Sequence, residues 1–221
     1  MNSPHNPTLL AGLLSGLLAM TGVSHAQELT PQARLAAGHL AATVCSACHG
    51  TAGRSISPAF PDLAGQTAPY LAAQLKAFRD QTRADPDAQA YMWGMAARLD
   101  DAMIEAIAAH YAAQQPAPGR PGDPRLIAHG RAIFEQGIPD RGIPACSSCH
   151  GDHAQGNGPF PRLAGQHAPY LLKQLLVIQS ALRVAPVMHG VIQDLSRDQM
   201  HAVAEYLASL SPARVPSSAG P

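Results

Sequence analysis

The sequence predicts an all-α protein in which one domain occurs twice in tandem, and three observations support this fold class. The block at residues 60–71 (FPDLAGQTAPYL) recurs at residues 160–171 (FPRLAGQHAPYL). Apolar side chains such as Leu71, Leu75 and Phe78 follow the spacing of an amphipathic helix. No stretch shows the alternation of apolar and polar residues that is typical of a strand. Two copies with a period near one hundred residues indicate a duplicated domain rather than a solenoid.

Each half is expected to open with a helix, over residues 31–44 and 124–136, because a capping residue is followed by proline at the first helical position. Gly38 and Gly130 lie inside these helices, where glycine costs about 1 kcal/mol relative to alanine. A cost of this size predicts a close helix crossing at both glycines. An insertion at residues 137–144 then follows in the second half and has no counterpart in the first.

Two more helices are expected in each half. One starts near Pro69 and near Pro169, and its apolar face follows helical spacing. The last one starts at the capping residues Asp100 and Ser196, with Gln199 completing a capping box in the second half.

The motif Cys-x-x-Cys-His occurs at residues 45–49 and again at residues 146–150, and together the two copies use all four cysteines of the chain. Two thiols one helical turn apart can each add to a vinyl group of haem, and the histidine that follows is held beneath the iron. Two covalently attached haem c groups are therefore expected. The attachment residues are Cys45, Cys48, Cys146 and Cys149, and the proximal iron ligands are His49 and His150.

Four paired cysteines could instead form one tetrahedral zinc site or two disulfides. A zinc ribbon does not explain a histidine directly after both pairs, and the pairs lie about a hundred residues apart, wider than ribbon spacing. A thioredoxin-like motif needs a strand-helix-strand context that neither copy has. These comparisons favour haem attachment.

A haem in an electron carrier normally has both axial positions filled. Met92 and Met188 each lie eight residues before the cap of the last helix, so the repeat favours them as distal ligands over core packing. Met95 and His189 compete with them, but neither has a ligating counterpart in the other half. A thioether opposite histidine raises the reduction potential relative to a second imidazole.

The second ring nitrogen of each proximal histidine needs a hydrogen-bond acceptor, and the backbone carbonyls of Pro61 and Pro161 are the candidates. Four repeated polar side chains are expected to contact haem propionates or the other half, although helix packing explains the tyrosines equally well: Gln66, Gln166, Tyr70 and Tyr170. The histidines without a repeated partner are interpreted as surface or structural: His39, His110, His129, His153, His167 and His201.

Residues 1–26 are expected to be a secretory signal, with an apolar run over residues 9–23 and a small-x-small cleavage pattern, although the segment has no Lys or Arg. A retained N-terminal anchor is the alternative. Export agrees with covalent haem, because free thiols tend to pair in an oxidising compartment. The expected domains are residues 27–115 and 125–211, joined by a semi-rigid Pro/Gly linker at 116–124 and followed by a flexible tail at 212–221.

Charge is distributed unevenly between the halves. From residue 27 to 115 there are six basic and eight acidic residues, a net charge of −2, and from residue 116 onward nine and seven, a net charge of +2. Such a dipole could orient docking to a partner, and an ordinary solvated surface explains it equally well. Neither half is basic enough to indicate nucleic-acid binding.

With these motifs, the chain resembles the dihaem cytochrome c4 family, in which two class I cytochrome c domains are fused head to tail. The resemblance covers nearly all of residues 27–211 and rests on the doubled haem motif, the doubled FPxLAGQxAPYL block and the late methionine. It implies two His/Met haems in a periplasmic carrier, with the domains related by a pseudo-twofold axis. Two departures concern the first half: its loop at residues 51–57 lacks the Gly-x-Gly pattern of the second half, and His110 stands where the second half has Tyr206.

The resemblance also implies redox partners and no small-molecule substrate. Family members commonly pass electrons from a quinol-oxidising cytochrome bc complex toward a terminal haem–copper oxidase, often while membrane-associated. We therefore expect a respiratory electron carrier and not an enzyme. The alternatives are a dihaem enzyme of the peroxidase or thiosulfate-oxidising type, which needs a vacant iron site, and a haem subunit bound to a dehydrogenase.

Overall fold

The structure is a computed structural model that describes Met1 and residues 29–213. The expected signal at residues 1–26, beyond Met1, lies outside the described residues, as does most of the expected tail at 212–221. Within the described part the chain is helical, and its extended pairing is limited to two isolated bridges, so the all-α prediction is confirmed. No described helix has the length and apolar character needed to cross a membrane.

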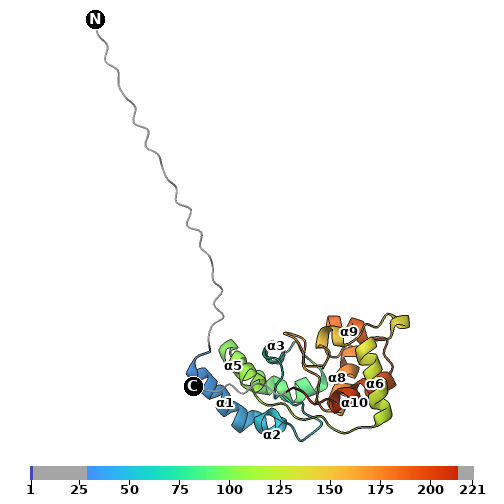
Figure 1. The fold of residues 1–221 in the computed structure, drawn as a ribbon. Helices are drawn as coiled ribbons and strands as arrows, with labels where there is room; N and C mark the ends of the chain where they lie inside the picture. Colours follow the sequence, from blue (N-terminus) through green and yellow to red (C-terminus); the bar gives the residue numbers. More distant parts are fainter. Residues whose placement is uncertain (2–28, 214–221) are drawn as a thin grey trace.

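The first half contains five α-helices with short π and 3-10 turns between them. They are α1 (Pro31–Leu40), α2 (Ser46–His49), α3 (Ala68–Arg79), α4 (Trp93–Ala96) and α5 (Asp101–Ala112). The second half repeats this order with α6 (Pro124–Gln136), α7 (Ser147–His150), α8 (Ala168–Gln179), α9 (Pro186–Ile192) and α10 (Arg197–Ser209). In Figure 1 the blue-to-green half and the yellow-to-red half lie side by side, each around its own helices.

The helix starts agree with the capping residues that the sequence predicts. The Thr30 hydroxyl accepts a hydrogen bond from the Ala33 amide at 3.1 Å, and Ser196 with Gln199 forms the expected capping box at α10. The first helix differs from its expected end at residue 44. It ends as an α-helix at Leu40 and continues as a π-helical turn, Ala41–Cys45, which leads directly into the haem motif.

The two glycines inside the first helices behave differently. In the second half, α6 crosses α10 so closely that a Cβ on Gly130 would lie 2.0 Å from the carbonyl oxygen of Ala202. In the first half, a Cβ on Gly38 would meet only the His110 ring, at an ordinary 3.7 Å. The predicted close crossing is therefore confirmed at Gly130 and wrong at Gly38, because a tight backbone contact faces only the former.

The connection between the halves packs against the body of the protein. Ala117 is buried, and the backbone amide of Arg120 donates to the carbonyl of Ala208 at 2.8 Å, near the end of α10. The Arg120 side chain also reaches the first half, where it forms an ion pair with the buried carboxylate of Asp62. The connection thereby joins both halves.

Candidate haem-binding sites

Each Cys-x-x-Cys-His motif ends in a one-turn helix, α2 or α7, whose histidine is buried. All four cysteines are free of disulfide bonds, and the second cysteine of each motif is exposed. Gly50 follows the first motif with φ of +74°, and a Cβ there would lie 1.9 Å from the carbonyl oxygen of Arg54. Glycine at this position lets the chain turn sharply after His49, so that α2 ends at this histidine.

The two motif histidines have the hydrogen bonds that the sequence predicts. The distance from Nδ1 of His49 to the carbonyl oxygen of Pro61 is 2.9 Å, and the distance from His150 to Pro161 is 3.0 Å. Because a carbonyl can only accept, Nδ1 carries the proton in both rings. Burial lowers the pKa of both histidines, and the hydrogen bond to the carbonyl opposes this shift in part. Each ring is thus neutral, with the lone pair of Nε2 available to a metal.

A phenylalanine packs edge-on against each of these rings. Ring centroids of His49 and Phe60 are 6.1 Å apart, and those of His150 and Phe160 are 6.3 Å apart, with interplanar angles of 69° and 74°. The carbonyl and the phenylalanine together restrict rotation of each histidine ring. The repeated Phe-Pro pair is therefore the structural support of the histidine.

The methionines expected as distal ligands lie in equivalent parts of the two halves. Met92 ends the π-helical turn Ala88–Met92 and packs against the small apolar cluster around Phe78, while Met188 lies in α9 against the second core. The competitor Met95 is exposed to solvent, and Nδ1 of His189 bonds the carbonyl of Ile178 at 2.9 Å. Iron ligation by Met92 and Met188 stays a prediction.

The glutamines of the repeated block cross between the halves. The Gln166 side chain accepts from the Asp62 amide and donates to the Asp62 carbonyl, both at 2.9 Å. The Gln66 side chain does the same with Arg162, accepting at 2.6 Å and donating at 2.9 Å. Of the two roles left open by the sequence, contact with the other half is confirmed for both glutamines.

Position 62 and its repeat, position 162, carry opposite charges and are both buried. Asp62 accepts from the Ser55 amide at 2.7 Å and from the Arg120 guanidinium at 2.8 Å. Arg162 instead donates to backbone carbonyls, including that of Ala64 at 2.6 Å. His167, interpreted from sequence as surface or structural, is buried here, and its Nε2 donates to the Ser55 carbonyl at 3.0 Å.

A second buried polar cluster joins α3 to α8, and sequence reasoning missed its two arginines. Arg183 donates to Tyr70 at 3.0 Å and to Gln74 at 2.9 Å, and Arg83 donates to Gln174 at 2.9 Å, all across the interface. The signal was available, because these arginines occupy equivalent positions, one hundred residues apart. Their single carboxylate partner among the described residues is Asp85, which leaves an excess of positive charge in a buried place.

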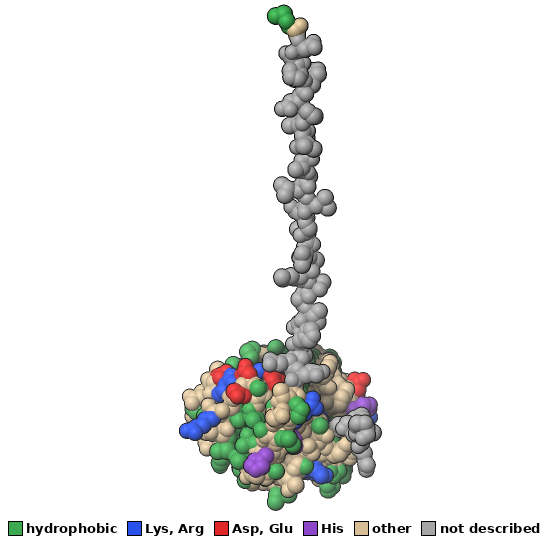
Figure 2. Space-filling model, turned by 90° about the vertical axis from the view of Figure 1, so that its left-hand side faces the viewer, with side chains coloured by type: hydrophobic (Ala, Val, Ile, Leu, Met, Phe, Trp, Pro, Cys, Tyr) green, Lys and Arg blue, Asp and Glu red, His purple; other side chains and the backbone are tan. Residues whose placement is uncertain are grey.

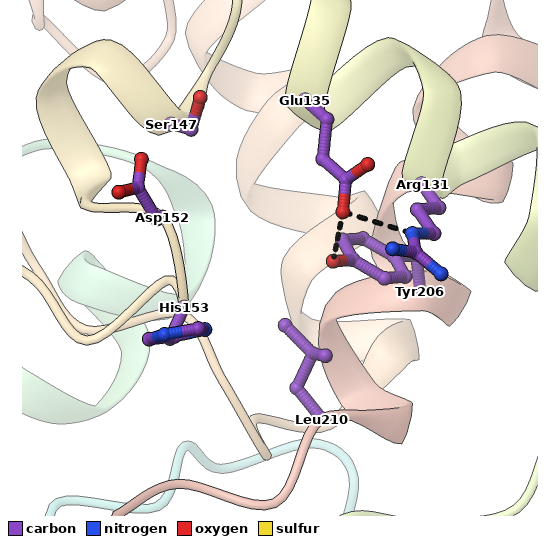
Figure 3. Close-up of a pocket in the computed structure, with 7 residues that line it drawn as sticks. All are labelled: Arg131, Glu135, Ser147, Asp152, His153, Tyr206 and Leu210. Atoms are coloured by element: carbon purple, nitrogen blue, oxygen red, sulfur yellow. Dashed lines mark hydrogen bonds and ion pairs between the residues drawn. The ribbon is translucent and has the colours of Figure 1, made fainter.

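The surface has an open pocket beside the second motif, and one face of the molecule is mixed in charge. A pocket of about 580 Å³ lies beside the second motif, and in it Glu135 accepts from Arg131 at 2.8 Å and from Tyr206 at 3.5 Å (Figure 3). In Figure 2, acidic and basic side chains lie next to one another among hydrophobic ones on the visible face. Neither feature resembles a binding site for a polyanion.

The residues present fit a covalently bound haem in each half. The thiols are unpaired, each histidine is neutral and oriented, and the buried arginines exceed their carboxylate partners. In the first half, the buried Tyr111 hydroxyl lies against the Cys45 thiol and has no oxygen or nitrogen hydrogen-bond partner among the described residues. A buried hydroxyl in this position beside an attachment cysteine fits a site that holds a further group.

Comparisons with known proteins agree with this site. The cytochrome c family model matches residues 35–112 and again residues 127–211. Cytochrome c4 of Pseudomonas aeruginosa is 36% identical over 211 residues, which cover 93% of this chain and 99% of that protein. A thiosulfate dehydrogenase electron acceptor of Thiomonas intermedia is 37% identical over 187 residues, covering 80% and 84%. The solved structure of Acidithiobacillus ferrooxidans cytochrome c4 has a TM-score of 0.72 and 43% identity, covering 75% and 98%.

Fold and site together define a c-type cytochrome with two tandem domains and two covalently attached haem c groups. The chain belongs to the dihaem cytochrome c4 family. It is accordingly an electron-transfer protein and not an enzyme, and its partners are redox proteins.

Proposed function

We propose that the chain is a periplasmic electron carrier of a respiratory chain with two His/Met haems. His49 and Met92 would ligate the first iron, and His150 and Met188 the second. The observation that carries the proposal is the repeated orientation of each proximal histidine by a backbone carbonyl, at 2.9 and 3.0 Å. A fixed ligand set at both irons suits electron transfer, because little has to move when an electron arrives or leaves.

Haem supplies one-electron exchange at its iron, and the chain supplies orientation, burial and charge. The Phe60 and Phe160 rings hold the histidines from the side. Arg83 and Arg183 carry positive charge that haem propionates would neutralise. The same arginines bind across the interface, so they also help to hold the two halves together.

The donor we propose is a quinol-oxidising cytochrome bc complex, and the acceptor a terminal haem–copper oxidase. Membership of the cytochrome c4 family and the expected signal at residues 1–26 support this placement. The whole segment 1–26 would then be removed on export or retained as a membrane anchor.

The test is stopped-flow oxidation and reduction of the purified haem-loaded chain with each complex. We expect full reduction by the bc complex with quinol present, and re-oxidation by the oxidase, both faster than in controls from which the complex is omitted. Failure to exchange electrons with either complex would remove the respiratory assignment and leave the haem sites untouched.

A second candidate has a specific observation in its favour. The relative named as a thiosulfate dehydrogenase electron acceptor is 37% identical, so this chain would instead accept electrons from a sulfur-compound dehydrogenase. Co-purification with such a dehydrogenase, and reduction of both haems by thiosulfate only when that enzyme is added, would favour this candidate. A haem that is reduced by thiosulfate without any partner would instead indicate a dihaem enzyme.

A further inference from the structure

One peptide group connects the proximal histidine of the first half to a side chain of the second half. The Pro61 carbonyl accepts from Nδ1 of His49 at 2.9 Å, and the amide of the same peptide group, on Asp62, donates to Gln166 Oε1 at 2.9 Å. The path from the histidine ring to the other half therefore contains two hydrogen bonds and one planar group.

The second half contains the same path in the opposite direction. The Pro161 carbonyl accepts from Nδ1 of His150 at 3.0 Å, and the Arg162 amide donates to Gln66 Oε1 at 2.6 Å. Each haem motif is thus joined to the glutamine of the opposite half, and not to the glutamine of its own.

Both glutamine amides are held in one orientation. Gln66 and Gln166 are 5% and 4% exposed. Nε2 of Gln66 donates to the carbonyl of Arg162, and Nε2 of Gln166 donates to the carbonyl of Asp62, both at 2.9 Å. Because the amide NH₂ group must face these carbonyls, Oε1 faces the backbone amides of Asp62 and Arg162. The two acceptors are therefore pre-oriented and shielded from water.

Hydrogen bonds at the two ends of a peptide group strengthen one another, by roughly 10–30% per bond. An amide that donates to glutamine makes its carbonyl a better acceptor for the histidine N–H. A histidine with a stronger acceptor is a more basic ligand. A more basic proximal ligand stabilises ferric iron and lowers the reduction potential of its haem.

We propose that Gln166 lowers the reduction potential of the haem on the first motif and that Gln66 lowers that of the haem on the second, each acting across the interface through one peptide group. The proposal rests on the proposed ligation by His49 and His150. It makes the docking of the two halves part of what sets both potentials.

The test compares Gln166→Met and Gln166→Glu in the haem-loaded full chain, by redox titration followed in the visible region and by proton NMR. Sequence-specific assignment of the ring protons of His49 and His150 assigns each potential to its half. We expect Gln166→Met, which lacks the acceptor, to raise the potential of the first haem and leave the second unchanged. Gln166→Glu keeps an acceptor oxygen, so we expect no rise.

Gln66→Met provides the reciprocal test, and we expect it to raise the second potential only. Thr67→Val is the matched control, because it removes another bond between the halves, from Thr67 Oγ1 to the Gly158 carbonyl at 2.7 Å, without touching either peptide group. A general loosening of the interface would change both reduction potentials in Thr67→Val. It would also change them by the same amount in Gln166→Met and Gln166→Glu.

The outcomes separate this proposal from the proposed function. The proposal is wrong if both haems keep their reduction potentials in Gln166→Met and in Gln66→Met. It is also wrong if each variant changes the potential of the haem in its own half. If Gln166→Met does not fold, Gln66→Met and Gln166→Glu still show in which direction the potential changes and whether the haem of the opposite half is the one affected. If the unmodified chain does not show a low-spin haem spectrum, the ligand assignment itself is wrong.

Discussion

The methionines proposed as distal ligands would decide whether each iron is closed to added ligands. We expect Met92→Ala to open the first iron and Met188→Ala the second, so that each ferrous variant binds carbon monoxide at one haem and that haem has a lower potential. Met95→Ala is the control, since Met95 is exposed and should leave both spectra unchanged. Carbon monoxide binding by Met95→Ala would show that the repeat assigns the ligand wrongly.

Asp62 is a buried charge of the first half that pairs with the segment connecting the halves. Asp62→Ala should destabilise the protein by about 3 kcal/mol, because it removes the partner of Arg120 and of the Ser55 amide from a fully buried site. Guanidinium unfolding measures the change. Asp101→Ala breaks an ion pair whose carboxylate is 70% exposed, and its effect should be too small to resolve. Equal losses in the two variants would contradict this explanation.

At the residue scale, the sequence predicts the role of a side chain better than the residues that it contacts. The carbonyls of Pro61 and Pro161 were predictable, because a ligand histidine needs an acceptor and the repeat places one at nearly the same spacing in each half. The ion pair between Asp62 and Arg120 was not, because it joins the first half to the connecting segment. Contacts of this kind depend on how the halves dock.

At the scale of elements, helix crossings also depend on contacts that the sequence does not predict. Gly38 and Gly130 give the same signal in sequence, yet α6 meets the Ala202 backbone while α1 meets the edge of the His110 ring. Glycine in a helix indicates a close approach only when the facing helix has a small residue at that level. The starts of α3, α5, α8 and α10 were predictable, because caps and prolines are local signals.

These glycines make a matched pair for mutation. Gly130→Ala should destabilise the protein by about 3 kcal/mol or force α6 away from α10, because the new Cβ would lie 2.0 Å from a backbone oxygen. Gly38→Ala should be neutral or stabilise by up to about 1 kcal/mol, since the helix gains a better helix former and the site has room. Guanidinium midpoints of the two haem-loaded variants provide the comparison. The account of the crossing is wrong if both variants lose stability equally.

For the whole molecule, the interface between the halves is polar and buried, and it contains the titratable side chain of His167. Burial lowers the pKa of His167, with Asp62 opposing the shift and Arg120 adding to it. The folded-state pKa therefore lies below the unfolded value of about 6.5, and the unfolded chain binds the proton at higher pH. The stabilisation is present above the unfolded pKa and is lost as pH falls through the folded pKa.

We accordingly expect the free energy of unfolding to decrease between pH 7 and pH 5. His167→Gln should have a flatter pH profile over this range, because glutamine can keep the donor toward Ser55 without titrating. The measurement is guanidinium unfolding at several pH values for both proteins. Identical slopes would show that His167 does not contribute to the pH dependence.

The repeat predicts two equivalent halves, and the structure shows why they are not identical. Positions 62 and 162 carry opposite charges, and positions 67 and 167 carry threonine and histidine. These differences gather at the interface, where one side chain from each half must fit the other. A sequence read one domain at a time cannot supply that constraint.

The most direct test of the central claim is a visible-region redox titration of the purified chain, repeated under carbon monoxide. Two closed His/Met haems predict two haems per chain, both at positive potential and neither binding the gas. One haem at low potential, or one that binds carbon monoxide, would contradict the assignment of two closed sites and would favour an exchangeable iron.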